Sequence, residues 1–459
     1  MKSVSMLPQA PGGMVVLGHA LPMLRDPLEF LRILPTYGDL VEIRVGPFKA
    51  VVICDPDLTQ QVFVNDRVFD KGGPFYDRVR EVIGNALGTC AHDGHRRQRR
   101  LAQPAFHRDR FPEYSQLMAR EIITVTRAWR DGQAIDVLSE TMMISTRISV
   151  ALMFGDTPLP ASLGEIIDHV TTMAKDVYMM MFLKRPLNRL PIPSARRFER
   201  ACKSLRTILG RLLHDRRSDE TGHHDLLSIL LAGGYTCGGA PATTGKEEQA
   251  LSDVEAIDQL ITFFIGSMET TGITLAWALD LTARHPDIQK SLQVEIDSFR
   301  GCPIRFDDLP ALALTQQVIT ETLRLYPPVW FMTRKTTADS RLGEHPIPAG
   351  TTLVYSPYLI HHRSDLHPDP NRFDPDRWTT GHTTPRHAFI PFGGGARKCI
   401  GDVFALTEAA LALAVITADW NLEPTTSQPP RPILGATLRP QRFTLRVTSR
   451  HSGEIRKFI

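Results

Sequence analysis

The sequence predicts a mainly α-helical fold with small β-sheets. Helical periodicity dominates from about residue 110 to residue 326, and the β-like stretches are few and short, the clearest being residues 40–45 and 49–53. One apolar helix after residue 252 is unusually long. No obvious linker interrupts the sequence, so we expect a single domain over residues 1–459, with a small sheet in its N-terminal segment 1–60.

The composition excludes several classes of protein. With 42% apolar and 22% charged residues, the chain can bury a large core and is neither disordered nor fibrous. A net charge of +3 is too mild to predict nucleic acid as a partner. The six cysteines include no CxxC pair and no regular spacing, which argues against a disulfide framework or a zinc module and favours a reducing compartment.

Two further segments bear on organisation and localisation. Residues 232–249 are rich in glycine and threonine, which predicts a flexible surface loop between helices. The apolar run at residues 14–17 is soon broken by His19 and Pro22, so it is too short to span a bilayer, and it lacks the charged start of a signal peptide. We therefore expect a cytoplasmic protein with no membrane span.

The long helix has clear start and stop signals. Ser252 can cap its beginning, Glu255 completes a capping box, and Pro286 follows its end. Roughly 33 residues at 1.5 Å each predict a rod of about 50 Å. Three acidic residues, spaced by three helical turns and so on one face, argue against a transmembrane segment. They are Asp258, Glu269 and Asp280.

A glycine-rich segment with a cysteine, residues 392–401, is the strongest chemical signal. Cys399 sits where an apolar helix begins, and backbone N–H groups and the helix dipole can stabilise its thiolate there. The flanking glycines let the backbone approach a flat cofactor closely. Arg397 is placed to meet an anionic group at the edge of that cofactor. The alternative interpretation is a buried cysteine beside a glycine-rich turn.

This segment resembles the haem-binding loop of the cytochrome P-450 family, FxxGxRxCxG, at all five positions. A chance match in a chain of this size is on the order of one in ten thousand. The matching residues are Phe392, Gly395, Arg397, Cys399 and Gly401. The resemblance implies the cytochrome P-450 fold, with a long central helix over haem b and a thiolate loop beneath it, and with Cys399 as the iron ligand.

Glu321 and Arg324 are similar to the ExxR motif of the family, and Arg377 in the stretch 373–378 is similar to its later arginine. Alone, a glutamate and an arginine three residues apart are common on solvated helices. The context favours the motif, because Pro327 and Pro328 end the helix. The resemblance implies a buried charged triad with a structural role.

The basic run at residues 95–100 has a bland interpretation as a solvated helix face. The resemblance implies instead that His95 and Arg99, four residues apart, reach a haem propionate, and that Arg334 reaches one as well. The remaining cations, together with Lys398, would form a positive face that docks an acidic electron donor.

Residues 263–271 look like the oxygen-binding stretch of the family. Gly266 and Thr270 are four apart and face the same way, so the glycine leaves room for dioxygen and the hydroxyl can donate to it. Glu269 would support proton delivery. The alternative for Thr270 is an ordinary helical threonine bonded to a preceding carbonyl. Ser267 stands where many members have glycine, and its hydroxyl would reposition a water at the oxygen site or change the helix distortion.

The candidate substrate contacts are apolar, which favours a neutral hydrophobic substrate, although such stripes are more often core than pocket. They are Phe75, Tyr76, Met180, Phe263, Val329, Trp330 and Phe331, with Met180 inside the run 177–183 and Phe264 beside Phe263. Several stretches, including residues 328–334 and 355–358, resemble actinobacterial oxygenases of sesquiterpene hydrocarbons. A fatty acid, a polyketide or a steroid would also suit.

The resemblance implies a monooxygenase that inserts one atom of O2 into a C–H bond of a secondary metabolite such as a terpene. No flavin or nicotinamide segment is apparent, so NAD(P)H electrons would arrive through a separate ferredoxin and ferredoxin reductase. A peroxide-driven or isomerising haem-thiolate enzyme is one alternative, and a haem sensor or carrier is another. The pair formed by Glu269 and Thr270 argues against both.

Overall fold

The structure is a computed structural model of the 459-residue chain. It describes residues 7–155, 165, 168–169, 172–173, 193–218, 225–231, 251–299, 304–379, 385 and 387–451. The chain divides into two compact units, each described by itself. The first unit comprises Met1–Arg78, Cys90–Asp93 and Leu323–Cys399, and the second comprises Val79–Thr89, Gly94–Thr322 and Ile400–Ile459. The predicted loop 232–249 lies outside the described residues, and the single domain stays a prediction.

The first unit is built on a five-stranded sheet with the order β1-β2-β8-β5-β3. Its strands are β1 (Leu40–Val45), β2 (Phe48–Ile53), β3 (Phe69–Asp70), β5 (Met332–Thr336) and β8 (Thr352–Tyr355). The predicted strands 40–45 and 49–53 are confirmed as β1 and β2, an antiparallel hairpin with Leu40 opposite Ile53. Strand β8 pairs in parallel with β2 and antiparallel with β5. It thereby brings the C-terminal part of the unit onto the N-terminal hairpin.

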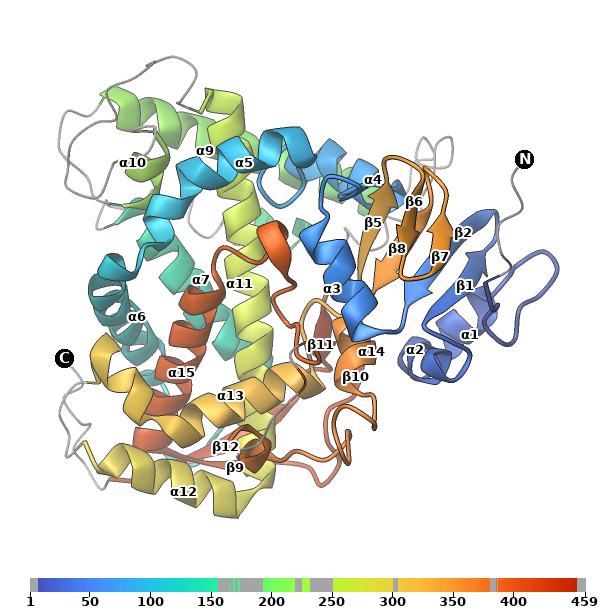
Figure 1. The fold of residues 1–459 in the computed structure, drawn as a ribbon. Coiled ribbons are helices and arrows are strands. Elements are labelled where there is room, and N and C mark those ends of the chain that lie inside the picture. The colour runs from blue at the N-terminus through green and yellow to red at the C-terminus, as the bar shows by residue number, and fades with distance from the viewer. Residues whose placement is uncertain are drawn as a thin grey trace. The chain divides into compact units, whose positions relative to one another are not determined.

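Short helices accompany this sheet (Figure 1). They are α1 (Ala20–Arg25), α2 (Pro27–Ile33), α3 (Pro56–Val64) and α14 (Pro357–His361), with the 3-10 turns η1 (Leu34–Thr36), η6 (Pro375–Trp378) and η7 (Gly395–Arg397). Helices α2 and α3 start alike, because an aspartate precedes a proline: Asp26 accepts from the Glu29 N–H and Asp55 from the Leu58 N–H. The strands β6 (Ser340–Leu342) and β7 (His345–Ile347) form a hairpin.

Helices make up most of the second unit. They are α6 (Phe111–Thr126), α7 (Val137–Phe154), α9 (Pro193–Ser218), α10 (Leu226–Leu231), α11 (Asp253–Arg284), α12 (Pro286–Asp297) and α15 (Asp402–Asp419), with the 3-10 turns η2 (Gln103–Phe106), η3 (Arg108–Arg110) and η5 (Phe306–Ala311). Figure 1 shows α11 running between its neighbours, and it packs against α7, α9, α12 and α15. Gly272 allows α7 to approach closely, because a Cβ there would lie 2.9 Å from the Met142 sulfur. The core of this unit therefore surrounds α11.

The second unit also contains two small sheets. One has the order β4-β12-β9, formed by β4 (Gln133–Asp136), β9 (Trp420–Pro424) and β12 (Thr444–Ser449). The other is the hairpin of β10 (Pro432–Leu434) and β11 (Leu438–Pro440). Helices α4 (Pro74–Ile83), α5 (His92–Ala102) and α13 (Ala313–Leu325) contain residues of both units. The predicted class, mainly α with small sheets, is confirmed.

The predicted capping box of the long helix is confirmed. The Ser252 hydroxyl accepts from the Glu255 N–H, and the Glu255 carboxylate accepts from the Ser252 N–H over 2.9 Å. Helices α7 and α11 are both long and apolar enough to cross a membrane, but 67% of each apolar window is buried. Asp258 and Asp280 pair with Arg206 and Arg284 within the same unit. Both helices therefore have the character of core helices.

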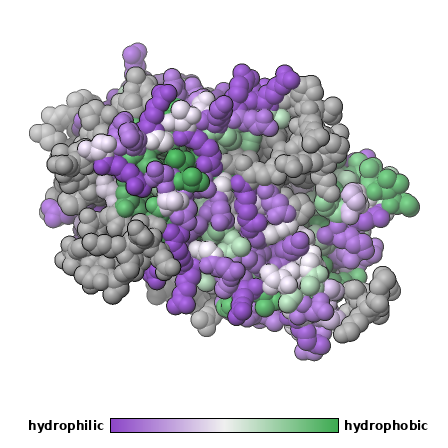
Figure 2. All heavy atoms as spheres, turned by 90° about the horizontal axis from the view of Figure 1, so that it is seen from above, coloured by the Kyte–Doolittle hydropathy of each residue, from purple (hydrophilic) through white to green (hydrophobic). Residues whose placement is uncertain are grey.

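On the face shown in Figure 2, hydrophilic side chains cover most of the described surface, and apolar ones gather in separate groups. Among the most exposed large apolar residues of the first unit are Val15, Val16 and Leu24, at 90%, 78% and 81% exposure. These belong to the N-terminal segment and not to the sheet. Val41 of β1 and Val52 of β2, by contrast, are fully buried.

Candidate active site

Cys399 ends the glycine-rich loop of the first unit. Its N–H donates to the Phe392 carbonyl over 3.0 Å, which closes the loop. Gly393 and Gly395 have φ angles of +68° and +63°, a region that favours glycine. A Cβ on Gly395 would lie 2.0 Å from the carbonyl oxygen of Phe63 in α3, so bare backbone is required at this contact. The Cys399 residue itself is exposed.

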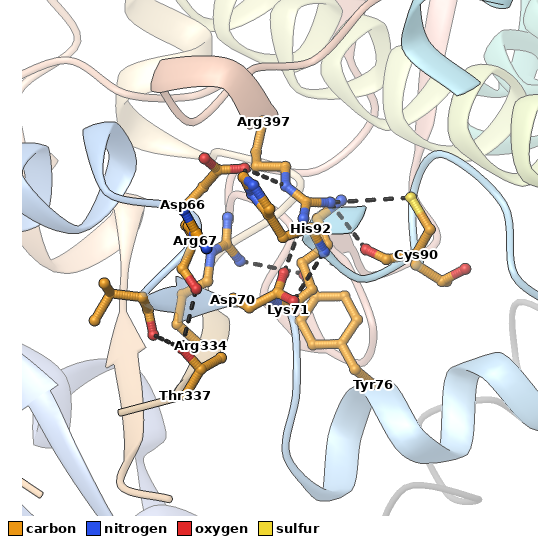
Figure 3. A network of polar contacts seen from close by, with 12 residues as sticks. Asp66, Arg67, Asp70, Lys71, Tyr76, Cys90, His92, Arg334, Thr337 and Arg397 are labelled. Carbon is orange, nitrogen blue, oxygen red and sulfur yellow. Dashed lines mark hydrogen bonds and ion pairs between the residues drawn. The ribbon is translucent and has the colours of Figure 1, made fainter. Parts of the chain in front are cut away.

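Arg397 anchors the loop to two carboxylates (Figure 3). Its Nε donates to Asp66 over 2.9 Å and its Nη2 to Asp70 over 2.8 Å, while Nη1 donates to the Cys90 carbonyl. The Arg397 side chain is only 2% exposed. Burial works to raise the pKa of Asp66, but hydrogen bonds from Arg397 and His92 outweigh it and hold that pKa below its ordinary value. Much of the donor capacity of Arg397 is thus used within the protein.

A second buried cation, Arg334 on β5, has partners of another kind. Its guanidinium donates to the hydroxyls of Tyr76 and Tyr355 over 3.4 and 3.5 Å, and to the Thr333 carbonyl. It also lies 5.2 Å from the Tyr355 ring centroid. Burial lowers the pKa of nearby Lys71 to about 7, and the charges of Arg334 and Arg397 act in the same direction. The network in Figure 3 therefore contains the basic side chains of Lys71, Arg334 and Arg397 together with the carboxylates Asp66 and Asp70.

Arg324, fully buried in α13, supports the segment that leads into the loop. It donates to the carbonyls of His361, Pro370 and Arg372 over 3.0, 2.8 and 3.1 Å. The His361 Nε2 in turn accepts from the Ile390 N–H over 2.9 Å. Burial holds the pKa of His361 well below its ordinary value, so the ring is neutral and can accept this bond. Arg324 thus reaches the cysteine loop through a buried histidine.

The predicted triad is divided between the units. Arg324 and Arg377 belong to the first unit, the latter in η6, and Glu321 belongs to the second. Glu321 and Arg324 are both fully buried on helix α13, whereas Arg377 is partly buried. The structural role of the three residues together stays a prediction.

In the second unit, α11 carries the predicted oxygen-binding residues. A Cβ on Gly266 would meet no heavy atom of the described chain within 4 Å. The Thr270 hydroxyl donates to the Gly266 carbonyl over 2.5 Å, which is the alternative the sequence left open. The Glu269 carboxyl accepts from the Thr437 hydroxyl over 2.8 Å. Burial raises the pKa of Glu269, and both Thr437 and Arg439 oppose that shift.

Ser267 points toward α7. Its hydroxyl donates to the Phe263 carbonyl over 2.7 Å and accepts from the Ser149 hydroxyl over 2.7 Å. Ser149 is itself fully buried. The Ser267 hydroxyl therefore stabilises the contact between α7 and α11. The sequence alone did not indicate Ser149 as its partner.

The basic run lies on α5 and its cations differ in environment. His95 is buried, at 5% exposure. Arg97 pairs with Glu255 at the start of α11 over 2.7 Å, so it stabilises the fold of the second unit. Arg99 is partly buried and Lys398, in the first unit, is exposed. The propionate contacts of His95 and Arg99 stay predictions.

Comparison with known proteins decides the family. The sequence profile described as cytochrome P-450 matches residues 8–447. The chain is a cytochrome P-450. It is 43% identical over 450 residues to pentalenene oxygenase of Streptomyces avermitilis, covering 97% of this chain and 98% of the relative. It is 40% identical to cyclooctat-9-en-7-ol 5-monooxygenase of Streptomyces melanosporofaciens, covering 94% and 90%.

A solved structure shares the fold of this P-450. The crystal structure of the cytochrome P450DA heme domain superposes with a TM-score of 0.85 at 24% sequence identity and covers 98% of both chains. The family and its named oxygenases establish a haem-dependent monooxygenase. It uses haem b and O2, with electrons from NAD(P)H that reach it through partner proteins.

The residues of the first unit fit this cofactor. The exposed Cys399 follows glycines whose backbone has no side chain to block a flat ring. Arg334 is buried with hydroxyl partners, and a buried guanidinium with this surrounding is suited to bind a carboxylate such as a haem propionate. When bound, the haem supplies the activation of dioxygen, which a thiolate ligand promotes.

The predicted pocket residues have different environments in this P-450. Phe263 packs edge-on against Phe106, and Trp330 packs edge-on against Phe331. Val329 is half-buried. Tyr76, predicted as an apolar contact, is a polar partner of Arg334. The side chain of Phe75, the residue Met180 and the run 177–183 lie outside the described residues.

Glu408 on α15 gives this P-450 a pH-dependent stability. It is fully buried, accepts from the Ser145 hydroxyl over 2.6 Å, and burial raises its pKa to about 8. Because the pKa of Glu408 is higher in the folded state than its unfolded value of 4.5, Glu408 contributes to the free energy of unfolding below pH 4.5. This contribution is lost as pH rises to about 8. The shift from 4.5 to about 8 is about 3.5 pH units, which at about 1.4 kcal/mol per unit corresponds to a loss on the order of 5 kcal/mol.

We therefore expect Glu408→Gln to flatten the decline of the thermal unfolding midpoint between pH 5.5 and pH 8. Glutamine can still accept from Ser145, but it has no proton to lose. Glu423→Gln, which changes an exposed carboxylate on β9, is the matched control and should retain the wild-type decline. Equal declines in wild type and Glu408→Gln would show that Glu408 does not carry the effect.

Proposed function

We propose that this P-450 hydroxylates a neutral terpene hydrocarbon. The observation that carries the proposal is full-length identity of 40% or more to enzymes named for pentalenene and for cyclooctatin and its precursor. The apolar character of the predicted contacts, such as Phe263 and Trp330, supports it, because a neutral hydrocarbon is bound by burial of apolar surface and little else.

In this proposal the Cys399 sulfur ligates the haem iron. Arg334 and Arg397 bind the propionate carboxylates from the first unit, with His95 and Arg99 as further propionate ligands from α5. Arg397 also holds the loop, since its bonds to Asp66 and Asp70 fix the backbone two residues before the sulfur. Phe392, at the start of the same loop, is a further haem-binding residue in this proposal.

Thr270 and Glu269 manage the protons that oxygen reduction consumes. Gly266 leaves space beside them, because no heavy atom of the described chain approaches its Cβ position. The Thr270 hydroxyl can turn from the Gly266 carbonyl toward that space. Burial raises the pKa of Glu269, so this carboxyl keeps its proton to a higher pH than an ordinary glutamate does.

The electron donor in this proposal is a ferredoxin with its ferredoxin reductase, in the cytoplasm. Ferredoxins are small proteins with an iron–sulfur cluster held by cysteines. Exposed cations suit an acidic partner of this kind, because charge complementarity steers association. Lys398 beside the thiolate and Arg96 and Arg100 on α5 are exposed.

Substrate titration of the haem-loaded enzyme tests the proposal. Pentalenene should shift the haem from low to high spin and give a product with one added oxygen, in a reaction that requires NAD(P)H, ferredoxin and reductase. Dodecanoic acid is the charged comparison and a macrolide the bulky one. A shift with dodecanoic acid but not with pentalenene would contradict the terpene proposal, and equal turnover with peroxide alone would favour the peroxide-driven alternative.

A further inference from the structure

The hairpin of β10 and β11 is docked on α11 at two points. The Trp277 indole N–H donates to the Leu438 carbonyl over 3.1 Å, and the Thr437 hydroxyl donates to Glu269 over 2.8 Å. Leu438 is fully buried and Thr437 is only 7% exposed. The Gly435 N–H donates to the Thr437 carbonyl, so the turn holds Thr437 in place from the hairpin side.

We propose that Thr437 is a positioning residue for Glu269. The Thr437 hydroxyl fixes the direction of the Glu269 carboxyl and favours the ionised form of that carboxyl. The inference rests on the proposed role of Glu269 in proton transfer. A hydroxyl carries one proton, and the Thr437 hydroxyl donates it to a carboxylate oxygen of Glu269. This hydrogen bond becomes weaker when the carboxyl is protonated. Thr437 therefore acts on the acid and not on the substrate.

The balance of influences on Glu269 makes this contact consequential. Burial favours the protonated acid and raises its pKa, whereas the Thr437 hydrogen bond and the positive charge of Arg439 favour the carboxylate. Within the described part of the chain, Arg439 is the charged group whose field acts on Glu269. An acid held between two opposing influences can both release and regain a proton, which is what proton delivery requires.

A purely structural role for Thr437 would be to fasten the hairpin to α11. Trp277 separates the two roles, because its single indole N–H fastens the same hairpin through the Leu438 carbonyl. Trp277→Phe therefore weakens the docking without removing the donor to the acid. Thr437→Val removes the donor while keeping the branched shape, and Thr437→Ser restores the hydroxyl.

Infrared spectroscopy of the haem-loaded enzyme tests the inference directly. The C=O stretching band of protonated Glu269 is identified by its loss in Glu269→Gln. In Thr437→Val the band should persist to higher pH than in wild type, Thr437→Ser should return it to the wild-type range, and Trp277→Phe should leave it unchanged. An unchanged titration in Thr437→Val, or an equal shift in Trp277→Phe, would overturn the inference.

Turnover with pentalenene as the probe gives the second readout. Thr437→Val should increase the share of NAD(P)H electrons that end as hydrogen peroxide about fivefold, an effect of the order expected when one hydrogen bond to the acid is lost. If Glu269→Gln leaves the peroxide share at the wild-type level, the proposed role of Glu269 fails and the inference fails with it. If Glu269→Gln raises it but Thr437→Val does not, only the role of Thr437 is wrong.

Discussion

Replacing Cys399 with serine is expected to abolish the long-wavelength absorption of the reduced, carbon monoxide-bound protein and all monooxygenase turnover. That absorption depends on a thiolate bound to the haem iron. Because an alcohol is a far weaker acid than a thiol, serine does not supply an anionic ligand that could replace the thiolate. The loop should survive the change, because the bond from residue 399 to the Phe392 carbonyl uses the backbone N–H.

Cys202→Ser is the matched control for this experiment. Cys202 lies on α9 in the second unit and is partly buried, so the change has the same chemistry at a different place. The control should keep the wild-type spectrum and turnover. An unchanged carbon monoxide spectrum in Cys399→Ser would show that the Cys399 sulfur is not the haem ligand. Loss of the spectrum in Cys202→Ser would show that the spectrum responds to any cysteine substitution and does not identify the ligand.

The features that were predictable from sequence are local ones. The capping box at Ser252 and Glu255 uses residues three apart, and α11 begins and ends next to the residues that signal its start and stop. The strands 40–45 and 49–53 are neighbours in one hairpin. Such patterns are visible in sequence because the atoms that interact are close along the chain.

The polar partners of the candidate site were not predictable, because they join distant parts of the chain. Asp66 lies 331 positions from Arg397, and Thr437 lies 168 positions from Glu269. Neither Asp66 nor Thr437 stands in a motif. Lys71 was missed for the same reason, since only the fold places it among Arg334 and Arg397. A single charged residue in a sequence is most often solvated, so only its environment in the folded protein identifies it as part of the candidate site.

Tyr76 illustrates a residue whose polar partner the sequence pattern did not indicate. It follows Phe75 in an apolar stretch, which favoured an apolar substrate contact. In the structure, burial raises the pKa of Tyr76 to about 12, and its hydroxyl accepts from Arg334. A tyrosine joins an apolar ring to a polar hydroxyl, and sequence does not say which end decides its place.

Replacing Arg397 with methionine is expected to destabilise the first unit by about 3 to 5 kcal/mol, because the buried Asp70 and the partly buried Asp66 would lose the buried cation that donates to both. Methionine keeps much of the side-chain volume but none of the donors. Denaturant unfolding at pH 7 measures the loss. The control is Arg341→Met, whose ion pair with Glu344 is exposed at 63% and 97%, and it should change stability by less than about 1 kcal/mol.

The pH dependence separates lost charge pairing from lost packing in Arg397→Met. Asp66 has a pKa below its ordinary value in the wild type, so its contribution to stability is present above the unfolded pKa of 3.8 and is lost as pH falls. Without Arg397, one of the two hydrogen bonds that lower the pKa of Asp66 is lost while burial still acts to raise it, so the Asp66 carboxyl takes up a proton at higher pH in the variant than in the wild type. The stability difference should therefore narrow between pH 7 and pH 4.5, whereas a packing defect would leave it constant.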